Sequence, residues 1–264
     1  MSATTFIFRV GVAIASFVCV GPLQSAENSD PLGQGWTSDQ IARWYETSQG
    51  SRLIPLAWLQ ALEQPESTAP FLADEHIRHF RYVPRDLALT KTTSGQKIRL
   101  PRGFAIDVSN DSKYAPDQTK LRWKQNQTET EPWVGMTCAA CHTTDISYRG
   151  QTWTILGAPA LADFQSFIRR LDKAMAQTLS DKEKFSRFSA GVLLKANSPV
   201  NQAFLRTSLQ TRVDWTRKLA QLNETDSTYG FGRLDAVGNI LNKVALITGA
   251  SNPLTNPSDA PVSY

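Results

Sequence analysis

The pattern Cys138-Ala-Ala-Cys141-His142 constrains this chain of 264 residues more than any other stretch. Two cysteines three positions apart lie about one helical turn apart, so both thiols can reach one flat macrocycle. C-x-x-C-H is the pattern by which haem c is attached, with the thiols bonded to its vinyl groups and the histidine binding its iron. The sequence therefore predicts one covalent haem c, held by Cys138 and Cys141, with His142 as an axial ligand of the iron.

Three other interpretations of this motif have less support. A structural zinc site needs four ligands, usually from two paired motifs, whereas the chain has no second cysteine pair and its only other histidines are His76 and His79. A thioredoxin-like redox pair would lie between a strand and a helix of a βαβ unit, and the flanking sequence does not indicate one. The third interpretation is two ordinary buried cysteines that precede a histidine by chance.

Residues 1–26 have the pattern of a secretory signal peptide. Arg9 precedes an apolar run over residues 10–20, and Ser25-Ala26 offers a cleavage position. The run is too short for a comfortable membrane span, so we expect a periplasmic or secreted chain without a stable membrane span. Cys19 would be removed with the signal, which leaves only the two motif cysteines. Export and haem attachment support each other, because C-x-x-C-H motifs are loaded outside the bacterial cytoplasm.

Composition restricts the class of partner. The 28 lysines and arginines exceed the 24 acidic residues by four, and they are spread along the chain rather than clustered. No nucleic-acid footprint is visible, so we expect no nucleic acid as partner. A mild positive surface would suit docking to a redox partner protein, although a solvated surface explains the charge more simply.

Apolar periodicity predicts a mostly α-helical domain over residues 27–264. A strand is expected over residues 104–108, a hairpin over 146–155 with Gly150 near its turn, and a long exposed loop over 110–131. Expected helices cover about 37–47, 56–62, 74–80, a stretch from 160 onward, 181–195, 200–222 and a last stretch that ends near 248.

Several segments taken in order resemble the di-haem cytochrome c peroxidase-like superfamily, nearest its rubber-oxygenase-like branch. They are GMTCAACHTT at 135–144, APALADFQ at 158–165, GFGRLDAVGN at 230–239 and APVSY at 260–264. The resemblance runs from about residue 53 to 264 and implies a cytochrome c-like haem domain with additional helices and irregular segments. Family members are exported, carry two c-type haems in two mostly helical domains, and handle peroxide or dioxygen or pass electrons.

The chain departs from this family in having one C-x-x-C-H motif. It resembles the N-terminal haem half alone, so a second haem domain would have to come from a separate chain. We expect electron transfer as the function, with a haem peroxidase or rubber-oxygenase-like dioxygenase half as the alternative. A gas or redox sensor is a third, binding-only interpretation, and whether the chain is an enzyme stays open at this point.

The second axial ligand of the iron is not obvious from the sequence. No histidine follows His142. Met175 lies on a periodic apolar stripe and is interpreted as a core residue, while Met136 is too near the motif to reach the opposite face. His76 and His79, three apart on one expected helix face, would be a partly exposed pair more often than ligands. We therefore expect an open or weakly ligated distal side.

Arg233 and Asp235 are the remaining candidates near a haem. An arginine can pair with a haem propionate. The simpler interpretation is an Arg–Asp pair that holds the glycine-rich turn. With three histidines in the whole chain, acid–base catalysis by histidine is poorly supplied.

Overall fold

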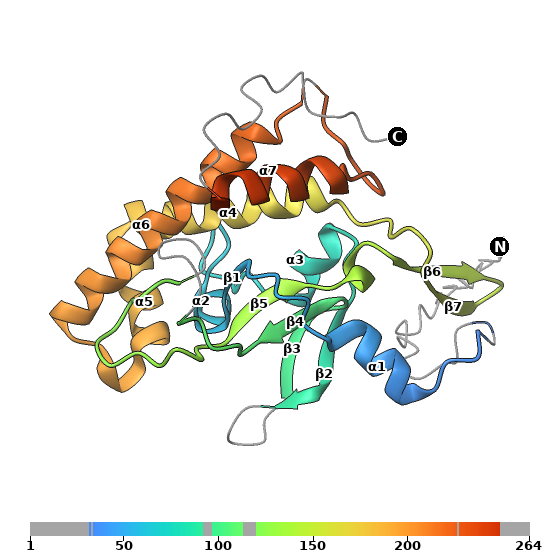
Figure 1. The fold of residues 1–264 in the computed structure, drawn as a ribbon, viewed down its shortest axis with the longest axis horizontal. Helices are drawn as coiled ribbons and strands as arrows, with labels where there is room; N and C mark the ends of the chain where they lie inside the picture. The colour runs from blue at the N-terminus through green and yellow to red at the C-terminus, as the bar shows by residue number, and fades with distance from the viewer. Residues whose placement is uncertain (1–31, 33, 92–96, 113–119, 226, 249–264) are drawn as a thin grey trace, which may run out of the picture.

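The computed structural model describes residues 32, 34–91, 97–112, 120–225 and 227–248 (Figure 1). The expected signal peptide and the segment 260–264 lie outside these residues. Helix accounts for 46% and strand for 18% of the described part. The expectation of a mostly α-helical chain is thus confirmed only in the coarser sense that helix exceeds strand.

The described helices follow the capping signals of the sequence. The Thr37 hydroxyl accepts a hydrogen bond from the Gln40 amide, and the Thr37 amide donates one to Gln40 Oε1, which is a capping box. Asp163, Asp181 and Ser198 cap three further helices, each by accepting a hydrogen bond from the amide three residues further along the chain. The helices are α1 (Ser38–Glu46), α2 (Leu56–Ala61), α3 (Asp74–His79), α4 (Phe164–Ser180), α5 (Lys182–Leu193), α6 (Pro199–Leu222) and α7 (Ala236–Thr248).

The described strands pair into three small antiparallel sheets. The first has the order β1-β5-β4, the second pairs β2 with β3, and the third pairs β6 with β7. The strands are β1 (Ile54–Pro55), β2 (Pro84–Lys91), β3 (Lys97–Pro101), β4 (Phe104–Asp107), β5 (Trp133–Met136), β6 (Thr143–Tyr148) and β7 (Gln151–Leu156).

The strand and the hairpin expected from the sequence are confirmed as β4 and β6–β7. Arg149 and Gly150 both have positive φ, at 48° and 77°, as a two-residue hairpin turn with two left-handed positions requires. Strands β1, β2, β3 and β5 were not predicted. β1, β3 and β5 are short, and β2 pairs with β3 through an irregular register. β5 also depends on partners that are distant in the chain, β1 and β4.

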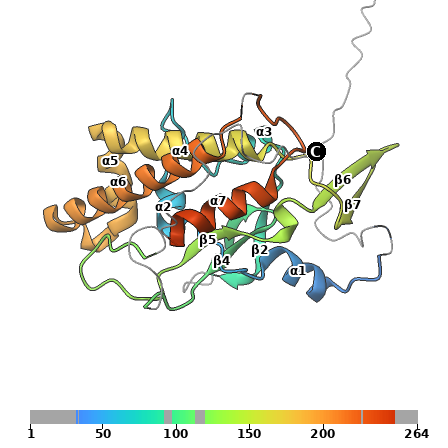
Figure 2. The same cartoon turned by 45° about the horizontal axis from the view of Figure 1, so that its top comes forward.

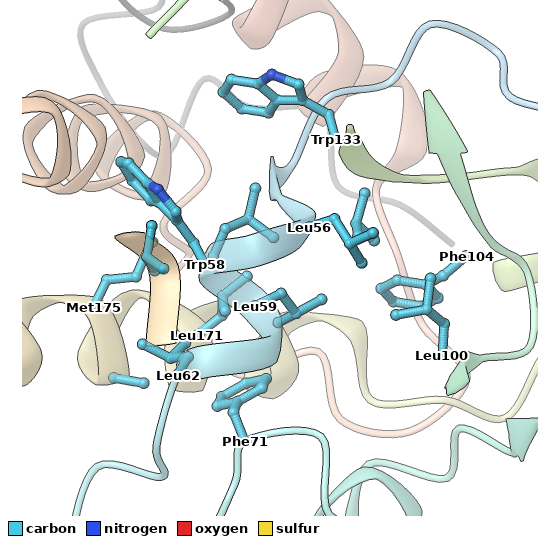
Figure 3. Packing of buried hydrophobic residues seen from close by; sticks show 14 of the residues in the cluster. Leu56, Trp58, Leu59, Leu62, Phe71, Leu100, Phe104, Trp133, Leu171 and Met175 are labelled. Carbon is cyan, nitrogen blue, oxygen red and sulfur yellow. The ribbon is translucent and has the colours of Figure 1, made fainter. Parts of the chain in front are cut away.

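The core lies between the helical layer of α2, α4, α5 and α6 and the sheet of β1, β5 and β4 (Figures 1 and 3). Trp58 of α2 is at its centre, with ring centroids 5.4 Å from Trp123 and 6.0 Å from Phe188 in edge-to-face contact. Met175 is 1% exposed in the same core, which confirms its interpretation as a packing residue.

The long loop over residues 110–131 is not exposed throughout, contrary to expectation. In its described part, Leu121 and Trp123 are buried in the core. Its polar groups bond to α6 instead of to water: the Gln125 amide donates to Asn201 Oδ1 at 2.8 Å, and Ser208 Oγ donates to the Arg122 carbonyl at 2.9 Å. These bonds satisfy the main chain of a segment that has no regular structure of its own.

Within the described residues, no helix combines the length and apolar character needed to span a membrane.

Candidate functional site

The C-x-x-C-H motif forms one tight turn directly after β5. Cys138–Ala140 is a 3-10 helix, in which the amides of Cys141 and His142 both donate to the Cys138 carbonyl, at 3.2 Å and 2.8 Å. Thr137 caps this turn through its hydroxyl, which accepts from the Ala139 amide at 3.2 Å. The expected turn geometry is thus present, although the chain enters β6 at once rather than continuing as a helix.

The motif rests on the main chain of the turn between β3 and β4. The Thr137 amide and hydroxyl both donate to the Gly103 carbonyl, at 2.8 Å and 3.2 Å. Gly103 has φ +80°, and a Cβ there would lie 2.1 Å from the Ala140 nitrogen. Only glycine allows this approach, so Gly103 fixes the height of the motif above the sheet.

The segment after the hairpin folds back over the motif. The Gly157 amide donates to the His142 carbonyl and the Ala160 amide to the Cys141 carbonyl, both at 2.8 Å. The Gly232 amide then donates to the Ala162 carbonyl at 3.1 Å. The segments 135–144, 158–165 and 230–239, far apart in the sequence, therefore meet at one place.

The reactive groups of the motif are accessible. Cys138 is exposed, and its sulfur accepts from the Gln49 side-chain amide at 3.1 Å. Cys141 is half-buried, and this burial together with the nearby Cys138 raises the pKa of the Cys141 thiol. Both thiols are free rather than joined in a disulfide. His142 is exposed, and within the described part of the chain no hydrogen bond holds its imidazole.

An apolar groove of about 210 Å³ lies between α4, α6 and α7 and reaches Met136, two residues before the motif. Ser51 and Met136 form its end nearest the motif, and the Met136 amide donates to Ser51 Oγ at 3.4 Å. No aspartate or glutamate of the described residues lines it. Its apolar wall includes Leu53, Met136, Phe164, Ile168, Leu219 and Ile240.

Helix α7 turns its apolar side away from the rest of the protein. Asn242, on the buried side, donates to the Leu222 carbonyl at 3.1 Å and to Asn223 Oδ1 at 2.8 Å, so polar bonds attach α7 to the end of α6 (Figure 2). The opposite side is a stripe of four apolar residues between 50% and 64% exposed. These residues are Val237, Ile240, Leu241 and Val244. Ile240 also lines the groove, so stripe and groove form one apolar surface of the kind that a ligand or partner covers.

The two histidines of α3 differ in exposure. His76 is buried between the rings of Phe71 and Phe80, whereas His79 is exposed. Both rings contact Phe80, at 5.2 Å and 5.3 Å between centroids, so the shared side of α3 is confirmed, whereas the expected partial exposure of both was wrong for His76 because the core covers it. Burial lowers the pKa of His76, and its Nδ1 lies 2.7 Å from the Phe71 carbonyl. Neither residue lines the groove.

Arg233 and Asp235 do not form the expected ion pair. Asp235 is buried and its carboxylate accepts the Gly238 amide at 2.8 Å, so it caps the start of α7. Arg233 is exposed. The expected Arg–Asp pair was wrong because the carboxylate satisfies a helix end instead.

Two of the three alternative interpretations, the zinc site and the thioredoxin-like pair, gain no support from the described residues. Among the described residues, no three His, Cys, Asp or Glu side chains converge as a zinc site would require. The described sheets are antiparallel, and the cysteines are followed by a hairpin rather than by the helix of a βαβ unit.

Three groove residues escaped the sequence analysis. Arg212 and Trp215 come from α6 and Lys243 from α7, and all three line the groove. Burial lowers the pKa of Arg212, and it lowers the pKa of Lys243 to about 8. A basic residue inside an otherwise apolar helix such as α7 is the one signal that could have identified Lys243.

No family model matches the chain, and no solved structure matches it. A protein of Sinorhizobium fredii (strain NBRC 101917 / NGR234), named "Uncharacterized protein y4iJ", is 31% identical over 227 residues. The match covers 81% of this chain and 35% of that protein. The chain therefore spans about a third of the length of this relative.

Proposed function

We propose that the chain is an exported c-type cytochrome that carries one haem through Cys138, Cys141 and His142 and exchanges electrons with a redox partner protein. The observation that carries this proposal is the position of the motif. Two free thiols and an unrestrained imidazole share one turn, which begins two residues after Met136, a residue that lines an apolar groove. We further propose a cytochrome c-like haem domain related to one half of the di-haem cytochrome c peroxidase-like proteins.

The residues present fit a haem. The thiols of Cys138 and Cys141 lie on one turn, as attachment to two vinyl groups requires. The groove has apolar walls for a flat apolar ring, and the buried Trp215 Nε1 has no hydrogen-bond partner in the described structure. When bound, the haem iron would supply one-electron redox chemistry.

The chain itself would hold and shield this group. The carbonyls of Cys141 and His142 are fixed by the amides of Ala160 and Gly157, so the motif backbone can move little between oxidation states. Apolar walls exclude water, which favours the less charged state of a redox centre and tunes its potential.

Covalent attachment is tested by producing the full chain together with a c-type haem maturation system and exporting it. The protein should be coloured, keep its pigment through acid–acetone extraction, and stain for haem on a denaturing gel. The double variant C138A/C141A should lose the stain. C19A is the matched control, because Cys19 lies within the expected signal and its loss should leave the stain unchanged. Colourless wild-type protein would contradict the proposal.

His142→Ala separates attachment from ligation. Both thioethers can still form, so haem should stay on the denaturing gel, while the absorption spectrum of the reduced protein changes because the iron loses a strong ligand. His79→Ala, an exposed histidine outside the groove, is the control and should leave the spectrum unchanged. An unaltered spectrum in H142A would contradict the assignment of His142 as a ligand of the iron.

The second candidate is the haem half of a peroxidase or of a rubber-oxygenase-like dioxygenase that requires a second haem domain. The observation in its favour is the exposed apolar stripe of α7 in a chain that spans about a third of its relative. Carbon monoxide should then shift the spectrum of the reduced protein. Purified protein should turn over peroxide, or consume dioxygen with polyisoprene, only after a second haem domain is added. Activity of the chain alone would refute this requirement.

A further inference from the structure

Three of the polar side chains that α6 and α7 contribute to the groove can only donate hydrogen bonds, whereas Thr216 and Asn239 beside them can also accept. Arg212, Trp215 and Lys243 line it with two cationic groups and an indole N–H. The Arg212 guanidinium carbon lies 4.5 Å from the Trp215 ring centroid and the Lys243 nitrogen 6.0 Å from it. All three side chains are hydrogen-bond donors without acceptor atoms, so their natural ligand is an acceptor.

Trp215 supplies an independent sign of a missing ligand. It is 5% exposed, and its Nε1 is buried with no hydrogen-bond partner among the described residues. A buried indole N–H normally finds a partner. Because Trp215 lines the groove, a ligand there can accept this hydrogen bond.

The two cations repel each other in a poorly solvated place. Burial lowers the pKa of Lys243, and the charge of Arg212 lowers it further. Lys243 has no ion pair within the described part of the chain. Arg212 is attracted by Asp172 and donates to the Leu53 carbonyl, and neither of these partners is an anion within the groove. An anion between the cations would relieve their repulsion.

We propose that Arg212, Trp215 and Lys243 form a carboxylate-binding site in the groove, where α6 faces α7, and that this site holds a propionate of the haem. The assignment to a haem propionate rests on the proposed function. A fatty acid presents the same chemistry, a carboxylate on an apolar body, and the test separates the two sources. Arg169 takes no part, because it is paired with Glu224 at 2.7 Å.

The test uses the full chain with C138A/C141A, in which binding is reversible, and titrates it with haemin and with haemin dimethyl ester. The ester keeps the ring and loses the carboxylate charges. Quenching of tryptophan fluorescence reports the affinity. The protein with an unchanged groove should bind haemin about 10- to 100-fold more tightly than the ester, because a hydrogen bond to a charged group contributes free energy of this size.

Lys243→Met should weaken haemin about tenfold or more and leave ester binding unchanged. Trp215→Phe, which keeps the ring and removes the N–H, should act in the same direction. Lys218→Met is the matched control, because Lys218 is exposed on α6 outside the groove, and it should change neither affinity. Arg212 is a poorer target, since it also donates to the Leu53 carbonyl.

Equal affinity for haemin and ester, or equal weakening of both by Lys243→Met, overturns the proposal, because damage to the fold would affect both probes. Laurate serves as the lipid probe: if it binds in a Lys243-dependent way and haemin does not, the haem assignment is overturned. Failure of the proposed function is a separate result, visible as the absence of covalent haem in the chain with its cysteines intact.

Discussion

Gly103→Ala tests whether the motif is positioned by the contact beneath it. Two costs are expected. The left-handed φ of +80° costs an alanine about 1–2 kcal/mol, partly offset by about 0.4–1 kcal/mol because the unfolded chain becomes stiffer. The added Cβ would also lie 2.1 Å from the Ala140 nitrogen, so the motif must move by about 1.3 Å to restore an ordinary contact of 3.4 Å.

That displacement affects more than the contact itself. Thr137 donates to the Gly103 carbonyl at 2.8 Å and 3.2 Å, and a shift of this size breaks at least one of these bonds at about 0.5–1.5 kcal/mol. Overpacking adds about 1–3 kcal/mol. We therefore expect Gly103→Ala to lower the free energy of unfolding by about 3–5 kcal/mol, a large part of the stability of a typical domain.

Gly150→Ala is the matched control, because Gly150 has φ +77° with nothing within 4 Å of its virtual Cβ. It carries the backbone cost alone, about 1 kcal/mol. Urea unfolding followed by tryptophan fluorescence measures both variants. A haem stain of exported protein shows whether the displaced motif is still loaded. Equal destabilisation by the two substitutions would refute the role of close approach at Gly103.

Three further predictions concern stability. Asp107→Asn should cost about 3–5 kcal/mol in urea unfolding, because it removes the carboxylate 2.8 Å from the buried Arg52 guanidinium; a loss below about 1 kcal/mol would contradict this. Trp123→Ala should cost about 3–5 kcal/mol because the ring is 1% exposed, whereas the control Trp36→Ala, at a ring 38% exposed, should cost much less; similar losses would place Trp123 outside the core. Lys243 has its pKa lowered from 10.5 to about 8, so between these values the unfolded chain binds a proton that the folded chain does not, and the stability of the haem-free protein should rise as pH increases across this window. Lys243→Met should remove that rise, and an equal rise in the variant would show that another group causes it.

The helices could be predicted because their signals are local. Thr37, Asp163, Asp181 and Ser198 each precede an apolar repeat of helical period, and each caps a helix in the structure. The hairpin β6–β7 could also be predicted, because Gly150 marks its turn. Strand β5 could not, because four residues that include a glycine show no period, and its partners β1 and β4 are distant in the chain.

The site could be predicted only in part, for a related reason. The motif residues share one short pattern, so their proximity follows from the sequence. The groove forms only where α6 and α7 pack together in the fold. Both helices are far from the motif in the sequence, so no short pattern links them to it. Arg212 resembles the other basic residues of α6 in sequence, but it is buried against the main chain at Leu53, just before β1, and no local pattern indicates that burial.

The hairpin β6–β7 starts immediately after His142 and ends at Leu156, next to Gly157, whose amide closes the base by bonding to the His142 carbonyl. The two ends of the hairpin are thus joined by a hydrogen bond, and its tip at residues 147–150 is exposed to solvent. Lengthening the tip, or inserting a dye-labelling tag there, should leave the cysteines where they are. A label near the two cysteines can therefore be attached at this place.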